Sequence, residues 1–221
     1  CIAYASWRIK SLYPHANIVV SPSDHVVTDT EEFARVIQSS LNFVSESDAI
    51  VTLGMKPDRP ETGYGYIQAD LRFSTARNKE IFIVDSFHEK PSLELAEKYI
   101  RQTNFYWNAG IFIWNVNTII NAFRVYQPDI SAIFENMLPY YNSPKESELI
   151  REKFPLCESI SVDYAILENA DEIYVFPADF GWSDVGTWHS LQKTLSTDTN
   201  GNTCVGKQIE TVDTHNCIIH T

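Results

Sequence analysis

Short apolar runs alternate with amphipathic stretches in the first third of the chain. Residues 1–13 have the pattern of the end of an amphipathic helix, and apolar runs follow at 16–20 and 49–53. Runs of this length are typical of strands that are buried on both faces, as in a parallel sheet. The stretch between the two runs has apolar residues at helical spacing, which predicts an amphipathic helix. Thr28 and Glu31 have the spacing of a capping box at its start. The order helix–strand–helix–strand predicts an α/β fold with helices on the faces of a parallel sheet.

The same alternation continues to about residue 200. We expect strands at 64–69, 80–87, 106–114 and 173–176. We also expect helices that begin at Ser92 and at Asn117, two short helices before Phe154, and separate helices over 162–169 and 187–194. Residues 201–221 are richer in Gly, Asn and Thr, with short β-prone runs at 204–205 and 217–219. We therefore expect one domain over 1–200 and, over 201–221, the start of a β-rich domain that the chain does not complete.

The chain is acidic, with 17 Lys and Arg against 29 Asp and Glu among 221 residues and a formal net charge of −12. Because an excess of Lys and Arg binds phosphate backbones and anionic lipids, this balance argues against nucleic acid and membrane surfaces as partners. No apolar run approaches the roughly 20 residues of a membrane-spanning helix, and no signal peptide opens the sequence. Small anionic ligands remain compatible with this charge, because local groups bind them.

The four cysteines, at 1, 157, 204 and 217, have neither CxxC spacing nor the Cys/His spacing of a structural zinc site. We expect four free thiols in a reducing compartment, and hence a cytoplasmic protein. The first residue is Cys1, and the residues after it have the pattern of a helix interior without a cap. We therefore expect the natural start of the protein to lie upstream.

Two aspartates follow buried strands and are candidate metal ligands. Asp24 lies in Ser-Pro-Ser-Asp-His after the run at 16–20, and Asp184 lies in a segment with two Trp and two Gly. Ligands of open α/β sheets bind at the carboxyl ends of strands, and Mg²⁺ is usually held by one or two carboxylates plus phosphates. The alternatives are that Asp24 makes an Asx-turn and that Asp184 caps the next helix. For His25 we favour a hydrogen-bonded structural histidine over a metal ligand.

Glu89 and Lys90 stand at the end of the strand predicted at 80–87. Adjacent strand residues point to opposite sides, so we expect no ion pair between them. A carboxylate that accepts sugar hydroxyls and an ammonium that meets a phosphate would suit a sugar phosphate. The alternative is an ordinary exposed strand end.

Other polar residues lie in positions where a ligand could explain them. Gly63 and Gly65 would expose backbone N–H groups beside Tyr64, or simply form a hairpin loop. Asn108 interrupts an apolar strand, and a buried amide must be hydrogen-bonded, to the backbone or to a ligand. Asp163 suits the first turn of a helix, where negative charge is favoured without any ligand.

The motifs SPSDH, TGYGYI, FHEKPS, YWNAGIFIW, SVDYAILE and FGWSDVGTW occur in this order over essentially the whole chain. The chain thereby resembles the mannose-1-phosphate guanylyltransferases, a family of sugar nucleotidyltransferases. The resemblance implies a Rossmann-like nucleotidyltransferase fold with a mixed, mostly parallel sheet. It also implies the Mg²⁺-dependent joining of GTP and mannose 1-phosphate to GDP-mannose and pyrophosphate.

The resemblance also assigns roles to individual residues. Carried over motif by motif, Asp24 and Asp184 would hold the metal and Lys90 the phosphate of the sugar. The residues that would line the sugar pocket are Tyr64, Gly65, Glu89, Asn108 and Asp163, with Glu89 on the mannose hydroxyls and Asp163 in a family position of less defined role.

The chain departs from the family pattern at its start. The family's Gly-rich nucleotide loop, with its Arg and Lys, precedes all these motifs and is absent here, so Cys1 would lie about a hundred residues into a domain of ordinary size. We expect a polypeptide that begins at Cys1 neither to fold well nor to turn over.

Two other functions stay open at this point. One is a nucleotidyltransferase for another sugar 1-phosphate or another base. The other is a non-catalytic nucleotide-sugar-binding protein, because a fold does not determine a function. The sequence is also compatible with a homodimer but does not specify one.

Overall fold

The computed structural model describes residues 1–186, 188, 192 and 195–221, with Phe73 described in its main chain only. These residues divide into two units by spatial contact. Unit 1 contains residues 1–21 and 31–179, and unit 2 contains 22–30 and 180–221. The domain boundary predicted at residue 200 stays a prediction, because units defined by spatial contact are not domains defined along the sequence.

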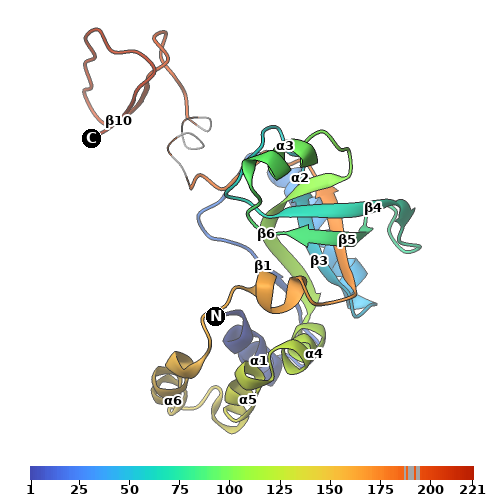
Figure 1. Ribbon diagram of the computed structural model, residues 1–221. Helices are drawn as coiled ribbons and strands as arrows, with labels where there is room; N and C mark the ends of the chain where they lie inside the picture. Colours follow the sequence, from blue (N-terminus) through green and yellow to red (C-terminus); the bar gives the residue numbers. More distant parts are fainter. Residues whose placement is uncertain (187, 189–191, 193–194) are drawn as a thin grey trace. The chain divides into compact units, whose positions relative to one another are not determined.

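A six-stranded sheet forms the centre of unit 1 (Figure 1). Its order is β1-β6-β3-β7-β5-β4, and the long β6 also pairs with β4. β3 and β7 are parallel neighbours, and the other neighbouring pairs are antiparallel. The strands are β1 (Asn17–Val20), β3 (Ile50–Met55), β4 (Tyr66–Ser74), β5 (Phe82–His88), β6 (Phe105–Asn115) and β7 (Ile173–Ala178).

The mixed α/β architecture is confirmed, with β1, β3, β4 and β7 running in one direction and β5 and β6 in the other. The two apolar runs that open the chain do run parallel, but they are not neighbours. β6 lies between β1 and β3 and pairs with both. Its apolar run is long enough to be buried between two strands, and local periodicity along the chain does not reveal such an insertion.

The helices of unit 1 include α1 (Ile2–Leu12), α2 (Thr30–Ser45), α3 (Leu93–Tyr99), α4 (Val116–Tyr126), α5 (Pro128–Glu135) and α6 (Glu146–Lys153), with a π-helical turn at Asp163–Leu167. Ser92 caps α3 as expected, accepting a hydrogen bond from the N–H of Leu95. The predicted capping box is wrong, because α2 begins at Thr30 and the Thr28 hydroxyl donates to the carbonyl of Gly181.

Helices α1, α4 and α5 pack together around aromatic side chains below the sheet (Figure 1). The Trp7 ring lies 5.9 Å from Phe123 and 6.2 Å from Phe134, and all three are buried in the main hydrophobic core. α1 is therefore fixed to the rest of unit 1 by its apolar face.

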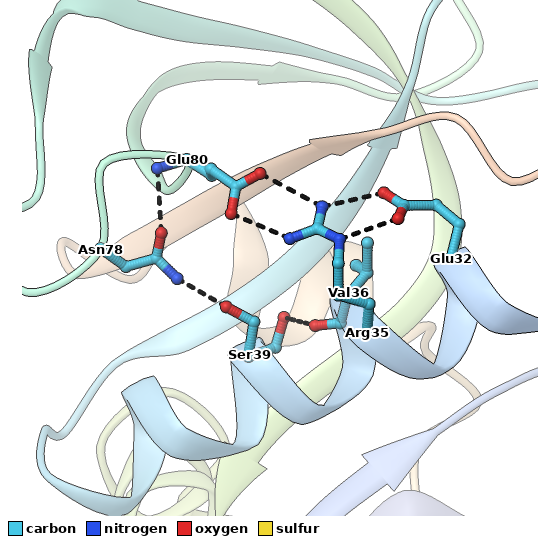
Figure 2. A network of polar contacts seen from close by, with 7 residues as sticks. Glu32, Arg35, Val36, Ser39, Asn78 and Glu80 are labelled. Atoms are coloured by element: carbon cyan, nitrogen blue, oxygen red, sulfur yellow. Dashed lines mark hydrogen bonds and ion pairs between the residues drawn. The ribbon is translucent and has the colours of Figure 1, made fainter.

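α2 is fixed to the turn before β5 by the polar network in Figure 2. The Arg35 guanidinium bridges Glu32, at 2.8 Å, and Glu80, at 3.0 Å, and the Asn78 amide donates to Ser39 at 2.7 Å. Exposed ion pairs stabilise little one by one. As a connected network, however, these contacts hold α2 against the start of β5, the strand that leads to Glu89.

A buried carboxylate connects α1 to α6. Glu146 accepts hydrogen bonds from the Tyr4 hydroxyl and the N–H of Asn142, and it pairs with Arg8 at 2.7 Å. Burial acts to raise the pKa of Glu146, but these hydrogen bonds and the charge of Arg8 outweigh it, so the pKa is lowered.

Replacing Glu146 by glutamine is expected to lower the free energy of unfolding by about 1–3 kcal/mol, because three groups lose a charged acceptor. Since the pKa of Glu146 in the folded protein is lowered, this stabilisation is present above the ordinary pKa of a glutamate side chain and is lost as the pH falls through the folded pKa. Urea unfolding at several pH values measures it. Glu152→Gln, at an exposed pair with Lys153 on the same helix, is the control and should change stability by less than about 0.5 kcal/mol. Equal effects of the two variants at neutral pH would contradict the role of Glu146.

Unit 2 contains two small sheets. β2 (Val26–Val27) pairs antiparallel with β8 (Trp182–Ser183), and β9 (Thr203–Val205) pairs in parallel with β10 (Ile218–His220). β9 and β10 confirm strands near both β-prone runs that were predicted beyond residue 200. The helix expected at 187–194 lies mostly outside the described residues. All four cysteines are free thiols, and none of the described helices is long and apolar enough to cross a membrane.

Candidate active site

A β-bulge in β6 presents Asn108. Thr52 pairs with Phe112 and Gly54 with Asn108, so a single residue of β3 lies opposite residues 109–111 of β6. Gly110 absorbs the irregularity with a φ of +68°, a conformation that glycine adopts without strain. The asparagine that interrupts the apolar pattern of this strand therefore stands where the regular ladder breaks.

The Asn108 side chain is hydrogen-bonded at both ends. Its Oδ1 accepts from the Thr52 hydroxyl at 3.0 Å and from the N–H of Gly110 at 3.1 Å. Its Nδ2 donates to Asp163 Oδ1 at 3.0 Å. The protein itself thus pairs both ends of the amide, and in doing so it brings together two predicted site residues, Asn108 and Asp163.

Gly65 and Glu89 belong to the same group. The backbone N–H of Asn108 donates to the carbonyl of Gly65 at 2.8 Å. A Cβ at Gly65 would lie only 2.5 Å from Glu89 Oε2, so the Glu89 carboxylate occupies the space that a side chain would need. The end of β5, the bulge in β6, the start of β4 and the π-helical turn therefore position a cluster of Gly65, Glu89, Asn108 and Asp163. We call it the sugar-site cluster, after the role that the sequence resemblance predicts for these residues.

The expectation that Glu89 and Lys90 form no ion pair is wrong. Lys90 Nζ lies 3.7 Å from Glu89 Oε1. β5 ends at His88, and Lys90 has a left-handed φ of +46°, so the strand alternation that would separate the two side chains no longer applies. The Lys90 side chain is 64% exposed and that of Glu89 only 14%, so an exposed ammonium pairs with a largely covered carboxylate.

Burial dominates the electrostatics of the sugar-site cluster. It raises the pKa of Asp163, and hydrogen bonds from its own backbone, from Asn108 and from Ser161 oppose the rise only in part. Burial also raises the pKa of Glu89, and the negative charge of Asp163 adds to the rise, whereas Lys90 lowers it. Two carboxylates with unfilled acceptor capacity beside one cation suit a ligand that carries both hydroxyl donors and an anionic group.

Tyr64 belongs to a neighbouring aromatic group. Its ring lies 5.3 Å from Trp107 at 86°, and the Arg59 guanidinium lies over both rings, 5.8 Å from Tyr64 and 4.9 Å from Trp107. The structure thus groups Tyr64 with Trp107 and Arg59, while Gly65, the next residue, contacts Glu89.

Asp24 and Asp184 both lie in unit 2, at the short β2–β8 ladder. Asp24 directly precedes His25, and His25 Nδ1 accepts a hydrogen bond from Trp182 Nε1 at 3.1 Å, two residues before Asp184. Burial lowers the pKa of His25, while the negative charges of both aspartates act to raise it. The two carboxylates therefore lie near the same imidazole, which is itself hydrogen-bonded as expected of a structural histidine.

A strained turn presents Asp184. Val185 has a φ of +44°, which is rare for a β-branched residue, and the N–H of Gly186 donates to Asp184 Oδ1 at 3.2 Å. Strain of this kind persists only where surrounding contacts enforce it, and it is often found at functional sites.

The aspartate pair fits the donor chemistry of Mg²⁺. Both side chains offer hard oxygen ligands, and among the described residues no ion pair with Lys or Arg compensates either charge. No cluster of three or more His, Cys, Asp or Glu that could hold a metal occurs in that same part of the chain. A cation here would therefore complete its coordination with water and phosphate oxygens, as Mg²⁺ ordinarily does.

The sequence did not lead us to Thr52 or Trp182 as site residues. Thr52 is a polar residue in the middle of an apolar strand, and a buried hydroxyl requires a hydrogen-bond partner, so a signal was present. For Trp182 the sequence showed an unusual density of Trp and Gly but not its partner, His25, which lies far away along the chain.

Comparisons with known proteins agree on one family. The model of the nucleotidyl transferase family matches residues 1–201. The chain is 34% identical over 223 residues to mannose-1-phosphate guanylyltransferase of Escherichia coli, an alignment that covers 100% of this chain and 48% of the relative. The corresponding protein of Salmonella montevideo is also 34% identical, with 99% and 46% covered.

A solved structure matches nearly the whole chain. The crystal structure of mannose-1-phosphate geranyltransferase from Thermus thermophilus aligns with a TM-score of 0.84 at 29% identity, covering 99% of this chain and 61% of that one. The chain spans about half the length of the curated relatives it matches.

Proposed function

The chain belongs to the nucleotidyl transferase family, and from this premise we propose that its protein joins GTP and mannose 1-phosphate to give GDP-mannose and pyrophosphate. The observation that carries the proposal is the sugar-site cluster with Lys90 at its exposed side. The names of the relatives support mannose 1-phosphate as the sugar substrate and a guanylyl group as the group transferred.

In this proposal the residues of unit 1 bind the sugar phosphate. The carboxylates of Glu89 and Asp163 accept hydrogen bonds from sugar hydroxyls, and the Asn108 amide fixes the position of Asp163. The ammonium of Lys90 binds the phosphate group and, in the transition state, stabilises the charge that develops on it. A sugar 1-phosphate carries both kinds of group, which matches the two kinds of side chain.

The proposed reaction needs no general base in the protein. The second pKa of a phosphate monoester is about 6, so mannose 1-phosphate is largely a dianion at pH 7 and is itself the nucleophile. One of its oxygens forms a bond to the α-phosphorus of GTP while the bond from that phosphorus to the leaving pyrophosphate breaks. Positioning and charge neutralisation therefore carry catalysis.

We further propose that Asp24 and Asp184 are the residues that hold Mg²⁺, whose bound charge offsets that of the phosphates. This assignment explains how a chain with a net charge of −12 can act on polyphosphates. It also favours an enzyme over a non-catalytic sugar-nucleotide-binding protein, because binding alone does not require a pair of uncompensated carboxylates.

Pyrophosphate release by the full-length protein tests the proposed function. With Mg²⁺, GTP and mannose 1-phosphate, we expect pyrophosphate and GDP-mannose in equal amounts. Glucose 1-phosphate in place of the mannose compound, and ATP or UTP in place of GTP, should give much slower release. A faster reaction with another sugar or base would replace this function by the second candidate, a nucleotidyltransferase of different specificity.

Replacing Gly65 by alanine is expected to lower kcat/KM for mannose 1-phosphate by about 10²-fold, because the new methyl group displaces the Glu89 carboxylate and misplacement of about 1 Å has effects of this size. Steady-state kinetics measures it. Gly63→Ala is the matched control, since a Cβ there meets only the Glu61 side chain at 3.4 Å. Equal activity of the two variants would show that Glu89 does not contact the sugar.

A further inference from the structure

Thr52 is a polar residue without solvent access. It lies in the middle of β3, where every residue is buried, and its own exposed fraction is 0%. Its hydroxyl donates to Asn108 Oδ1 at 3.0 Å. We propose that Thr52 is a positioning residue, whose hydroxyl holds the Asn108 amide in the single orientation that places the Asp163 carboxylate for a sugar hydroxyl.

The β6 bulge makes this contact available. Thr52 pairs across the ladder with Phe112, and residues 109–111 are taken up by the bulge before pairing resumes at Asn108. The bulge therefore moves the Asn108 side chain out of regular register and within reach of a hydroxyl on β3. In a regular ladder Asn108 would lie farther along β3, away from Thr52.

The Gly110 N–H and the Asp163 carboxylate determine which way the amide faces, and the Thr52 hydroxyl holds it there. An asparagine side chain has an acceptor end and a donor end, and here two donors, the Thr52 hydroxyl and the Gly110 N–H, face the acceptor. The donor end is thereby directed to Asp163 Oδ1. Rotating the amide by half a turn would set the carbonyl oxygen against the Asp163 carboxylate and the NH₂ group against the Gly110 N–H.

Asp163 needs this support because it is half-buried beside Glu89. Burial disfavours its charged form, and its negative charge raises the pKa of the neighbouring Glu89. A donor in a fixed position stabilises the ionised carboxylate, and because a carboxylate has about four acceptor sites, it can still accept a hydrogen bond from a ligand. Thr52 thus acts on the sugar pocket through Asn108 without touching the sugar, an inference that rests on the proposed function of the site.

Thr52→Val and Thr52→Ser in the full-length protein test the inference. Valine keeps the shape and removes the hydroxyl, whereas serine keeps the hydroxyl. We expect Thr52→Val to raise KM for mannose 1-phosphate about tenfold, equivalent to about 1.4 kcal/mol, with an unchanged KM for GTP. Serine should restore the wild-type KM to within about twofold. If valine prevents folding, Thr52→Ala serves as the variant without a hydroxyl.

A second measurement follows the amide itself. By NMR, hydrogen exchange of the Asn108 side-chain NH₂ should be faster in Thr52→Val than in the wild type and in Thr52→Ser. Unchanged exchange, or equal changes in KM for both substrates, would overturn the inference. A wild-type protein that releases no pyrophosphate would instead contradict the proposed function, while the exchange rates would still decide whether Thr52 positions Asn108.

Discussion

Replacing Asp184 by asparagine in the full-length protein is expected to lower kcat by about 10³-fold, the equivalent of ~4 kcal/mol of lost transition-state stabilisation. The amide oxygen of asparagine can still accept the hydrogen bond from Gly186, so the strained turn at Val185 should keep its shape. What is lost is one of the two negative charges that we propose for holding Mg²⁺. Pyrophosphate release over a series of Mg²⁺ concentrations measures both the fall in kcat and the weaker dependence on the metal.

The Asp184 variant needs a control for charge and a control for folding. Asp171→Asn removes an equal charge at an exposed position of unit 1 and should leave kcat unchanged. Unchanged circular dichroism of Asp184→Asn would exclude unfolding as the cause of its low activity. Binding of Mn²⁺ alone, followed by electron paramagnetic resonance, should weaken in Asp184→Asn. Full activity of this variant would refute the metal role of the aspartate pair.

The second large effect is expected at Lys90. Lys90→Gln should lower kcat/KM for mannose 1-phosphate by about 10²-fold. The reason is that Lys90 is a positive charge already in place beside the phosphates, so it stabilises the transition state without any rearrangement of the site. The change should be larger for the sugar phosphate than for GTP, since Lys90 belongs to the same unit as Glu89 and Asp163. Steady-state kinetics with each substrate varied in turn separates the two.

Lys98→Gln is the matched control for this experiment. Lys98 lies on α3, shortly after Lys90 in the chain, and it forms an exposed ion pair with Glu94 at 2.7 Å. Its loss should leave both KM values within about twofold of wild type, because exposed pairs of this kind contribute little. If Lys90→Gln and Lys98→Gln behave alike, Lys90 does not bind the sugar phosphate.

Local patterns in the sequence were sufficient to predict most elements of unit 1. The apolar runs at 16–20 and 49–53 became β1 and β3, and the cap at Ser92 was found where the sequence indicated it. These features depend on residues that are close along the chain. The order of the strands was not predictable in the same way, because the insertion of β6 between β1 and β3 depends on contacts between distant segments.

The same distinction between features set by nearby residues and features set by distant segments applies to the candidate site. Asp24 and Asp184 were candidate metal ligands because each follows a strand, and the structure places both near His25 in unit 2. The ion pair between Glu89 and Lys90 was missed because strand alternation was assumed to continue past His88, whereas Lys90 adopts a left-handed conformation. The partners of Asn108 were missed because they depend on a bulge, which periodicity does not reveal.

A crystal structure of the full-length protein with GDP-mannose and Mn²⁺ is the most direct test of the central claim, that this chain carries the sugar-phosphate site and the metal ligands of a nucleotidyltransferase. We expect mannose hydroxyls on Glu89 and Asp163, a phosphate oxygen within reach of Lys90, and anomalous density for Mn²⁺ at Asp24 and Asp184. Mannose bound away from the sugar-site cluster, or a metal ion held by other residues, would contradict the account.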